Sequence, residues 1–232
     1  MCTINIGGLS QHKVNMVSWY LLRHKVDVCF LIDVRLTVME SSYRVKEFKQ
    51  RLGTEIYVGS TLHSESKTTC GVGGQLVIVT QKWKQHLFNK SCDESGLGLT
   101  LEVYFRTGSG KLLIQGTYWP YHDKKTPGPN SLHATLNEWL RVSKRGGNPL
   151  DWIQKKIGNK MTNHLLSPGN SYILAGDLNK TYDNKGKGLK LKKWADDLGL
   201  KNPVCEYNIC KNICLYTRYT GTMGTSHIDQ IF

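Results

Sequence analysis

The stretch from Gly176 to Asn179 combines residue types that could do chemistry at the end of an expected strand. The apolar run 172–175 leads into it, and the two-residue spacing of Asp177 and Asn179 puts both side chains on the same side of an extended chain. An anionic acceptor beside a carboxamide suits a metal-bound phosphate and an attacking water. The alternative is a simple turn, because Gly-Asp is common where strands end.

Other expected strand ends also carry polar side chains: Asn5, Asp33, Tyr118 and Asp229. A layered α/β fold gathers strand ends along one edge, so these residues can meet although they are far apart in the chain. Converging carboxylates are costly without a cation, and Mg²⁺ binds one or two carboxylates, several waters and substrate phosphates. The pattern therefore predicts metal-assisted phosphodiester hydrolysis.

Each of these residues also has a purely structural explanation, because polar residues at strand ends often cap turns or pair with neighbours. In that reading Tyr118 simply packs. The remaining pairings are Asn5 with the Gly7-Gly8 turn, Asp33 with Arg35 or with backbone amides, and Asp229 with His227 or a turn.

Charge is the strongest feature of the composition. Among 232 residues, 31 Lys and Arg stand against 18 Asp and Glu, which gives a net charge of +13 and attracts polyanions, nucleic acid first and acidic membrane second. No apolar run approaches the roughly 20 residues that span a bilayer, and no signal peptide is visible. Seven cysteines, an odd number without zinc-site spacing, favour a reducing nuclear or cytoplasmic location.

Strands and helices alternate along the chain, with hairpins as well as crossovers. This predicts one α/β domain over 1–232, built on mixed sheets, with a helical excursion at about 122–170. We expect a hairpin between the strictly alternating segment 97–105 and the following strand. The expected strands are 3–6, 26–32, 75–79, 97–105, 112–118 and 172–175, and the expected helices are 11–25, 131–143, 149–165 and 188–198.

The order of these motifs resembles the endonuclease/exonuclease/phosphatase (DNase I-like) superfamily. Within it, the Ser226-His227-Ile228-Asp229 ending and the Thr217-Arg218 stretch most resemble the apurinic-type endonuclease domain of LINE-type non-LTR retrotransposons. The other motifs that carry the resemblance are Ile4-Asn5-Ile6-Gly7-Gly8-Leu9, Leu31-Ile32-Asp33, Gly73-Gly74, Tyr118-Trp119-Pro120 and Gly176-Asp177-Leu178-Asn179.

The resemblance implies a four-layer α/β sandwich and a DNA endonuclease that uses Mg²⁺, or alternatively Mn²⁺, to nick one strand of double-stranded DNA beside a reverse transcriptase domain. It also implies residue roles. Asp33 and Asn5 would hold the metal, and Lys180, Thr217 and Arg218 would contact DNA. Tyr118 and Asn179 would bind the phosphate, Asp177 would activate the water, and Asp229 would orient a catalytic histidine.

Three departures lower the expected activity. Asp33 stands where the family usually has Glu, Tyr121 replaces a common Asn, and no closing Ser-Asp-His follows Asp229, so the last strand is expected to be lacking. We therefore expect weak or no nicking, because the missing His would stabilise the charge that develops on the phosphate. The alternatives are a relative acting on another phosphate ester, disfavoured by the lack of a visible membrane-binding helix or exposed aromatic loop, and a decayed domain that binds nucleic acid without cutting.

Overall fold

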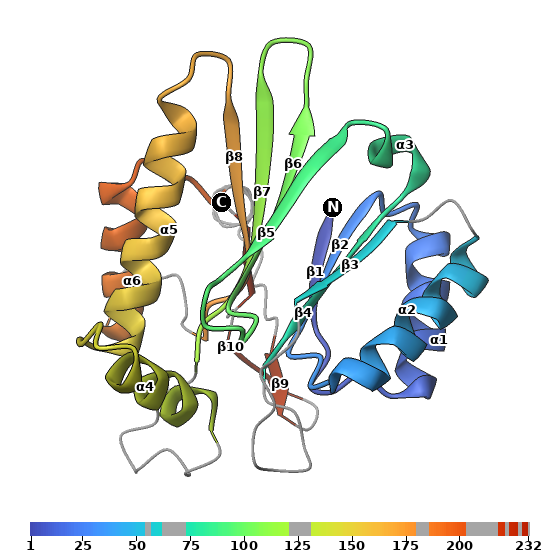
Figure 1. Cartoon of the computed structure of the whole chain (residues 1–232), viewed down its shortest axis with the longest axis horizontal. Helices are drawn as coiled ribbons and strands as arrows, with labels where there is room; N and C mark the ends of the chain where they lie inside the picture. The colour runs from blue at the N-terminus through green and yellow to red at the C-terminus, as the bar shows by residue number, and fades with distance from the viewer. Residues whose placement is uncertain are drawn as a thin grey trace.

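The computed structural model describes residues 1–53, 57–61, 73–120, 131–179, 186–202, 218–220, 223–226 and 229–231. Two β-sheets pack face to face and helices cover both outer faces, so the described chain forms the expected four-layer α/β sandwich (Figure 1). The helices on one side are α1 (Gln11–Arg23) and α2 (Val38–Leu52), with the short α3 (Gln81–Lys84), and those on the other are α4 (Leu132–Val142), α5 (Pro149–Leu165) and α6 (Gly186–Asp197).

The first sheet is mixed and has the order β1-β2-β4-β3. Strands β1 and β2 are parallel, with Asn5 opposite Ile32, and β4 pairs antiparallel with both β2 and β3. The strands are β1 (Cys2–Asn5), β2 (Val28–Ile32), β3 (Tyr57–Thr61) and β4 (Gln75–Val79). This order brings the carboxyl ends of β1 and β2 to the same edge.

The second sheet has the order β11-β8-β7-β6-β5 and is also mixed. Strands β6 and β7 form the expected hairpin, and β7 pairs parallel with β8 so that Tyr118 lies opposite Asp177. The strands are β5 (Leu87–Cys92), β6 (Thr100–Arg106), β7 (Lys111–Tyr118), β8 (Ser171–Asp177) and β11 (Asp229–Ile231), with a separate two-stranded ribbon of β9 (Arg218–Thr220) and β10 (Met223–Ser226).

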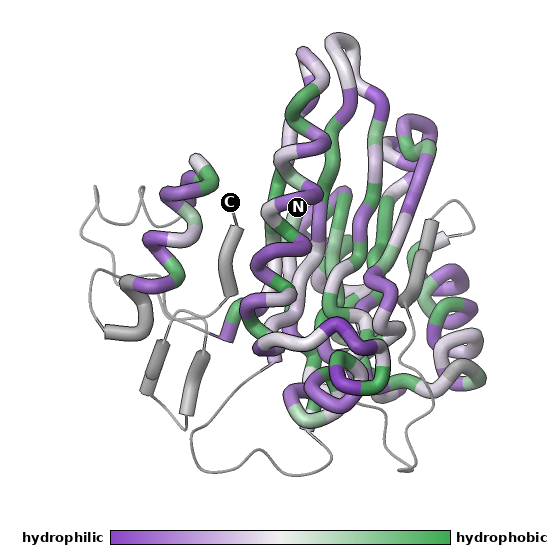
Figure 2. The backbone as a smooth tube through the Cα atoms, turned by 60° about the vertical axis from the view of Figure 1, so that its left-hand side comes forward, coloured by the Kyte–Doolittle hydropathy of each residue, from purple (hydrophilic) through white to green (hydrophobic). Residues whose placement is uncertain are grey.

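Three hydrophobic layers hold the sandwich together. Strand β2 shows how they arise, because its alternating side chains serve two layers: Leu31 faces α1 and α2, while Phe30 faces the second sheet. The third layer joins Leu174 of β8 to α4, α5 and α6. Figure 2 shows apolar and polar segments alternating along the helices, as expected of helices with one buried face.

Helices α4 and α5 lie in the part of the chain expected to be a helical excursion, and Leu136 of α4 and Ile153 of α5 are fully buried in the layer that covers the second sheet. Helix α2 was not expected, although a capping box formed by Thr37 and Glu40 marks its start.

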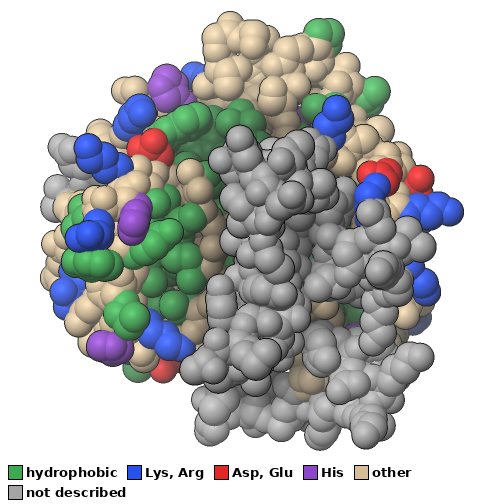
Figure 3. Space-filling model, turned by 180° about the vertical axis from the view of Figure 1, so that it is seen from behind, with side chains coloured by type: hydrophobic (Ala, Val, Ile, Leu, Met, Phe, Trp, Pro, Cys, Tyr) green, Lys and Arg blue, Asp and Glu red, His purple; other side chains and the backbone are tan. Residues whose placement is uncertain are grey.

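Helix α1 exposes apolar as well as basic side chains. Trp19 and Leu22 are each 60% exposed and Met16 is 58% exposed, and Arg23 lies over the Trp19 ring at 5.2 Å. Figure 3 shows hydrophobic and basic side chains together on the side formed by α1 and α2. Helix α1 therefore exposes a group of apolar side chains that the sequence analysis did not single out. None of the helices in the described ranges is long and apolar enough to cross a membrane.

Candidate active site

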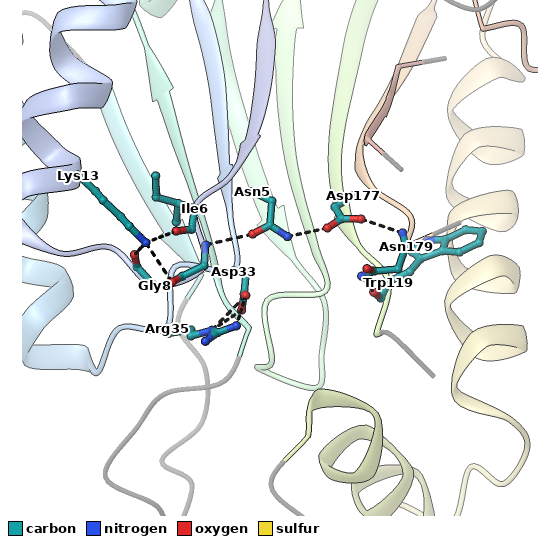
Figure 4. A network of polar contacts seen from close by, with 10 residues as sticks. Asn5, Ile6, Gly8, Lys13, Asp33, Arg35, Trp119, Asp177 and Asn179 are labelled. Carbon is teal, nitrogen blue, oxygen red and sulfur yellow. Dashed lines mark hydrogen bonds and ion pairs between the residues drawn. The ribbon is translucent and has the colours of Figure 1, made fainter. Parts of the chain in front are cut away.

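Asn5 and Asp177 join the two sheets at the edge where β1 and β8 end. The Nδ2 group of Asn5 donates a hydrogen bond of 2.6 Å to Oδ2 of Asp177, across 172 residues of sequence (Figure 4). Asp177 is 1% exposed. The predicted convergence of strand ends is thus observed for this pair.

The turn after β1 fixes the orientation of Asn5. Its Oδ1 accepts a hydrogen bond from the Gly7 backbone N–H at 3.1 Å, so Asn5 caps the Gly7-Gly8 turn as its structural explanation predicts. Lys13 of α1 then closes the turn from the other side. Its Nζ donates to the carbonyls of Ile6, Gly7 and Gly8 at 2.6, 3.2 and 2.9 Å.

The end of β8 fixes the other half of the pair. Oδ1 of Asp177 accepts a 2.8 Å bond from the backbone N–H of Asn179, so a separate donor orients each carboxylate oxygen. Asn179 adopts a left-handed conformation (φ 49°), which Asn tolerates better than most residues. Its side chain donates to the Trp119 carbonyl at 2.6 Å, and the Trp119 ring is fully buried against Trp194 of α6.

Tyr118 lies beside Asp177 on the neighbouring strand. Burial raises the pKa of its phenol well above the ordinary value, and the negative charges of Asp33 and Asp177 raise it further. The charge of Arg35 and a hydrogen bond with the Asn179 side chain act in the opposite direction. The phenol is therefore protonated at any physiological pH and can donate a hydrogen bond.

Asp33 follows β2 but turns toward Arg35. The guanidinium donates from Nη2 to Oδ2 at 2.6 Å and from Nε to both oxygens at 3.1 Å. In Figure 4 this ion pair lies beside the contact between Asn5 and Asp177. The alternative pairing of Asp33 with Arg35 is thus the one found.

In the observed conformation, the side chains around Asp33 do not fit a divalent metal ion. Both oxygens of Asp33 accept from a cation already, and its side chain is only 5% exposed, whereas Mg²⁺ keeps several waters when it binds. Within the described ranges, no three His, Cys, Asp or Glu side chains gather closely enough to hold a metal ion.

The remaining candidates lie at the limits of the described structure. The antiparallel pairing of β11 with β8 sets Asp229 opposite Asp177 in register, and Arg218 begins β9. Lys180, Thr217, Tyr121 and His227 lie outside the described residues, as do Cys205, Cys210 and Cys214.

Sequence reasoning missed two groups at the site and left a third without a role. Lys13 had no signal beyond its position eight residues after Asn5, and the backbone carbonyl of Trp119 carries no signal at all. Arg35 was recognised as a partner for Asp33, but its hold on both carboxylate oxygens depends on backbone conformation and could not be seen from spacing.

The comparisons with known proteins place the fold. No family model and no curated protein matches the sequence. Among solved structures, an AP endonuclease from Archaeoglobus fulgidus is 15% identical, with a TM-score of 0.64 over 100% of this chain and 86% of that one. The 3′ phosphatase NExo from Neisseria, bound to product DNA hairpin, is 13% identical, with a TM-score of 0.63 over 99% and 84%.

The endonuclease domain of TRAS1, a telomere-specific non-LTR retrotransposon, is 14% identical, with a TM-score of 0.51 over 99% of this chain and 81% of that one. Each of these matches covers 99% or more of this chain, so the likeness extends over the whole fold. The chain has the α/β fold of the endonuclease/exonuclease/phosphatase superfamily, whose members among its structural neighbours are nucleases and phosphatases.

Proposed function

We propose that the chain is a DNA-binding phosphodiesterase domain whose reaction centre is the Asp177 carboxylate. The observation that carries the proposal is the contact between Asn5 and Asp177, because it joins the two sheets at the edge where β1 and β8 end. A buried carboxylate oriented by two donors, beside a half-buried tyrosine, is more than a turn requires.

The residues divide the work of hydrolysis between them. Asp177, oriented by Asn5 and Asn179, accepts the proton of the attacking water as a general base. Tyr118 donates its phenolic hydrogen to a phosphate oxygen, where negative charge develops. Asn179 serves mainly to position Asp177, because its side chain is bonded to the Trp119 carbonyl.

DNA is the substrate class that the charge favours. A net charge of +13 attracts the phosphate backbone, and Lys190 and Lys193 are exposed on α6, just beyond the Asp177 motif. Binding of this kind weakens steeply as salt rises. The likeness to the TRAS1 endonuclease domain supports a narrower role, the nicking of one DNA strand to prime reverse transcription by an associated domain.

The test is a nicking assay on supercoiled plasmid, run with Mg²⁺ and separately with Mn²⁺ because Asp33 does not offer a ready metal site. Because the sequence departures predict weak nicking, we expect only a low yield of open circles from the native chain and none from Asp177→Asn. The matched control is Asp151→Asn, which removes the same charge from the exposed start of α5. Equal nicking by Asp177→Asn would refute the assignment, and salt-sensitive binding without nicking would favour a non-catalytic DNA-binding domain.

A second candidate is a phosphate ester at a lipid surface. The observation in its favour is α1, where Met16, Trp19 and Leu22 are exposed beside Arg23. Aromatic and aliphatic side chains flanked by basic residues suit the boundary of an anionic bilayer. Flotation with vesicles of phosphatidylserine and phosphatidylcholine distinguishes the candidates, because a DNA enzyme without lipid affinity stays at the bottom of the gradient.

A further inference from the structure

The ion pair between Asp33 and Arg35 lies where the sequence predicted a metal ligand. Three N–H···O contacts of 2.6 to 3.1 Å engage both carboxylate oxygens of Asp33. The pair is asymmetric in exposure, because the Asp33 side chain is 5% exposed and the Arg35 side chain 51%. The carboxylate is therefore buried, whereas the guanidinium that pairs with it reaches solvent.

The backbone holds this arrangement in place. Asp33 and Arg35 both adopt left-handed conformations, with φ of 59° and 51°, which cost energy for residues with a Cβ. Surrounding hydrogen bonds impose them. The Gly8 N–H donates to the Asp33 carbonyl at 2.7 Å, and the Arg35 N–H donates to the Gly73 carbonyl at 2.9 Å. A chance side-chain contact on the surface would have no such support.

We infer that Arg35 is a built-in competitor of a divalent cation, so that a metal ion binds Asp33 only when the guanidinium leaves it. A divalent cation bound to this carboxylate would lie close to the guanidinium charge, so the two cations repel each other and compete for the same oxygens. The inference deepens the proposed function, on which it rests for the role of a metal in the site. It concerns metal affinity and not the choice of nucleic acid.

The competition has a measurable consequence. Removal of the guanidinium frees both carboxylate oxygens of Asp33 and removes a positive charge from their immediate surroundings. We expect Arg35→Gln to bind Mn²⁺ at least about tenfold more tightly than the native chain, a difference of about 1.4 kcal/mol. Asp33→Asn in the Arg35→Gln background is expected to abolish the added affinity.

The experiment titrates the protein with Mn²⁺ alone and follows the free ion by electron paramagnetic resonance. The matched control is Arg44→Gln, which removes the same charge from α2, where Arg44 pairs with Glu47 at 2.9 Å. Tighter binding by Arg35→Gln with unchanged binding by Arg44→Gln supports the inference. Equal affinity in Arg35→Gln and the native chain, or an equal gain in both variants, overturns it.

A second variant and a DNA-free titration separate metal affinity from folding and from nicking. If Arg35→Gln fails to fold, Arg35→Gly serves the same purpose, because glycine removes the side chain and tolerates the left-handed backbone. The titration contains no DNA, so its outcome does not depend on the nicking assay. Tight Mn²⁺ binding by Arg35→Gln without nicking would reject the proposed function and leave the competition intact.

Discussion

Lys13 offers the sharpest test of how the site is held. Its ammonium group donates to three consecutive carbonyls of the turn that follows Asn5. Lys13→Met keeps most of the side-chain length but removes all three bonds. The turn would then lose the group that closes it, and Asn5 would lose its fixed direction toward Asp177.

The magnitude follows from the exposure of the three contacts. Two of these hydrogen bonds are partly buried and one is exposed, so only two of them contribute substantially to the free energy of unfolding. A hydrogen bond to a charged group contributes about 1.5–3 kcal/mol, which for a half-exposed lysine we reduce to about 1 kcal/mol each. The total of about 2 kcal/mol corresponds to a Tm lower by about 4–8 °C for a chain of this size.

Thermal unfolding followed by circular dichroism measures this shift. The control is Lys155→Met, because Lys155 is exposed on α5, away from the turn. We also expect Lys13→Met to lose most plasmid nicking at a temperature where it remains folded. A Tm within 1 °C of the native value, or an equal loss in both variants, would refute the view that Lys13 holds the turn.

Three further outcomes are expected. Gly176→Ala should prevent folding, because an added Cβ would lie 1.9 Å from the backbone oxygen of Thr117 on the paired strand. The control is Gly108→Ala, whose added Cβ would meet nothing within 4 Å, and soluble yield and circular dichroism compare the two variants. Cys2 should be alkylated before Cys29, because the hydrogen bond from Cys29 lowers the pKa of Cys2, whereas the pKa of the buried Cys29 is raised. Peptide mapping after a brief iodoacetamide pulse measures the order of alkylation. Stability should fall as the pH rises above about 10, because the phenol of the unfolded chain then loses its proton while the raised pKa of Tyr118 keeps the folded phenol protonated. Proton loss therefore favours the unfolded chain, and Tyr118→Phe should flatten this pH dependence of Tm.

The sequence predicted those elements whose hydrophobic pattern is strong. The strand at 75–79 and the hairpin of β6 and β7 were found where expected, because continuous or alternating apolar residues define them. Strand β5 could not be foreseen, since most of its side chains are exposed and no alternation marks it. Helix α2 could have been, because Thr37 and Glu40 have capping-box spacing.

The site was predictable only in part, for a geometric reason. The convergence of Asn5 and Asp177 follows from strand ends that share one edge, which a pattern of strands can indicate. The direction of Asp33 depends on left-handed backbone at two residues that are not glycine, and a sequence gives no sign of that. Residue type therefore identified the participants, and backbone conformation decided their partners.

The sequence separation between Asn5 and Asp177 has a consequence for the order of folding. Strands β5, β6 and β7 follow one another and can pair as soon as they are synthesised, whereas the contact of β1 with β8 must close a loop of 172 residues. The proposed reaction centre is therefore expected to be among the last features to form on a ribosome. Until β8 has been made, the growing chain can hold most of its first sheet and still lack the contact between Asn5 and Asp177.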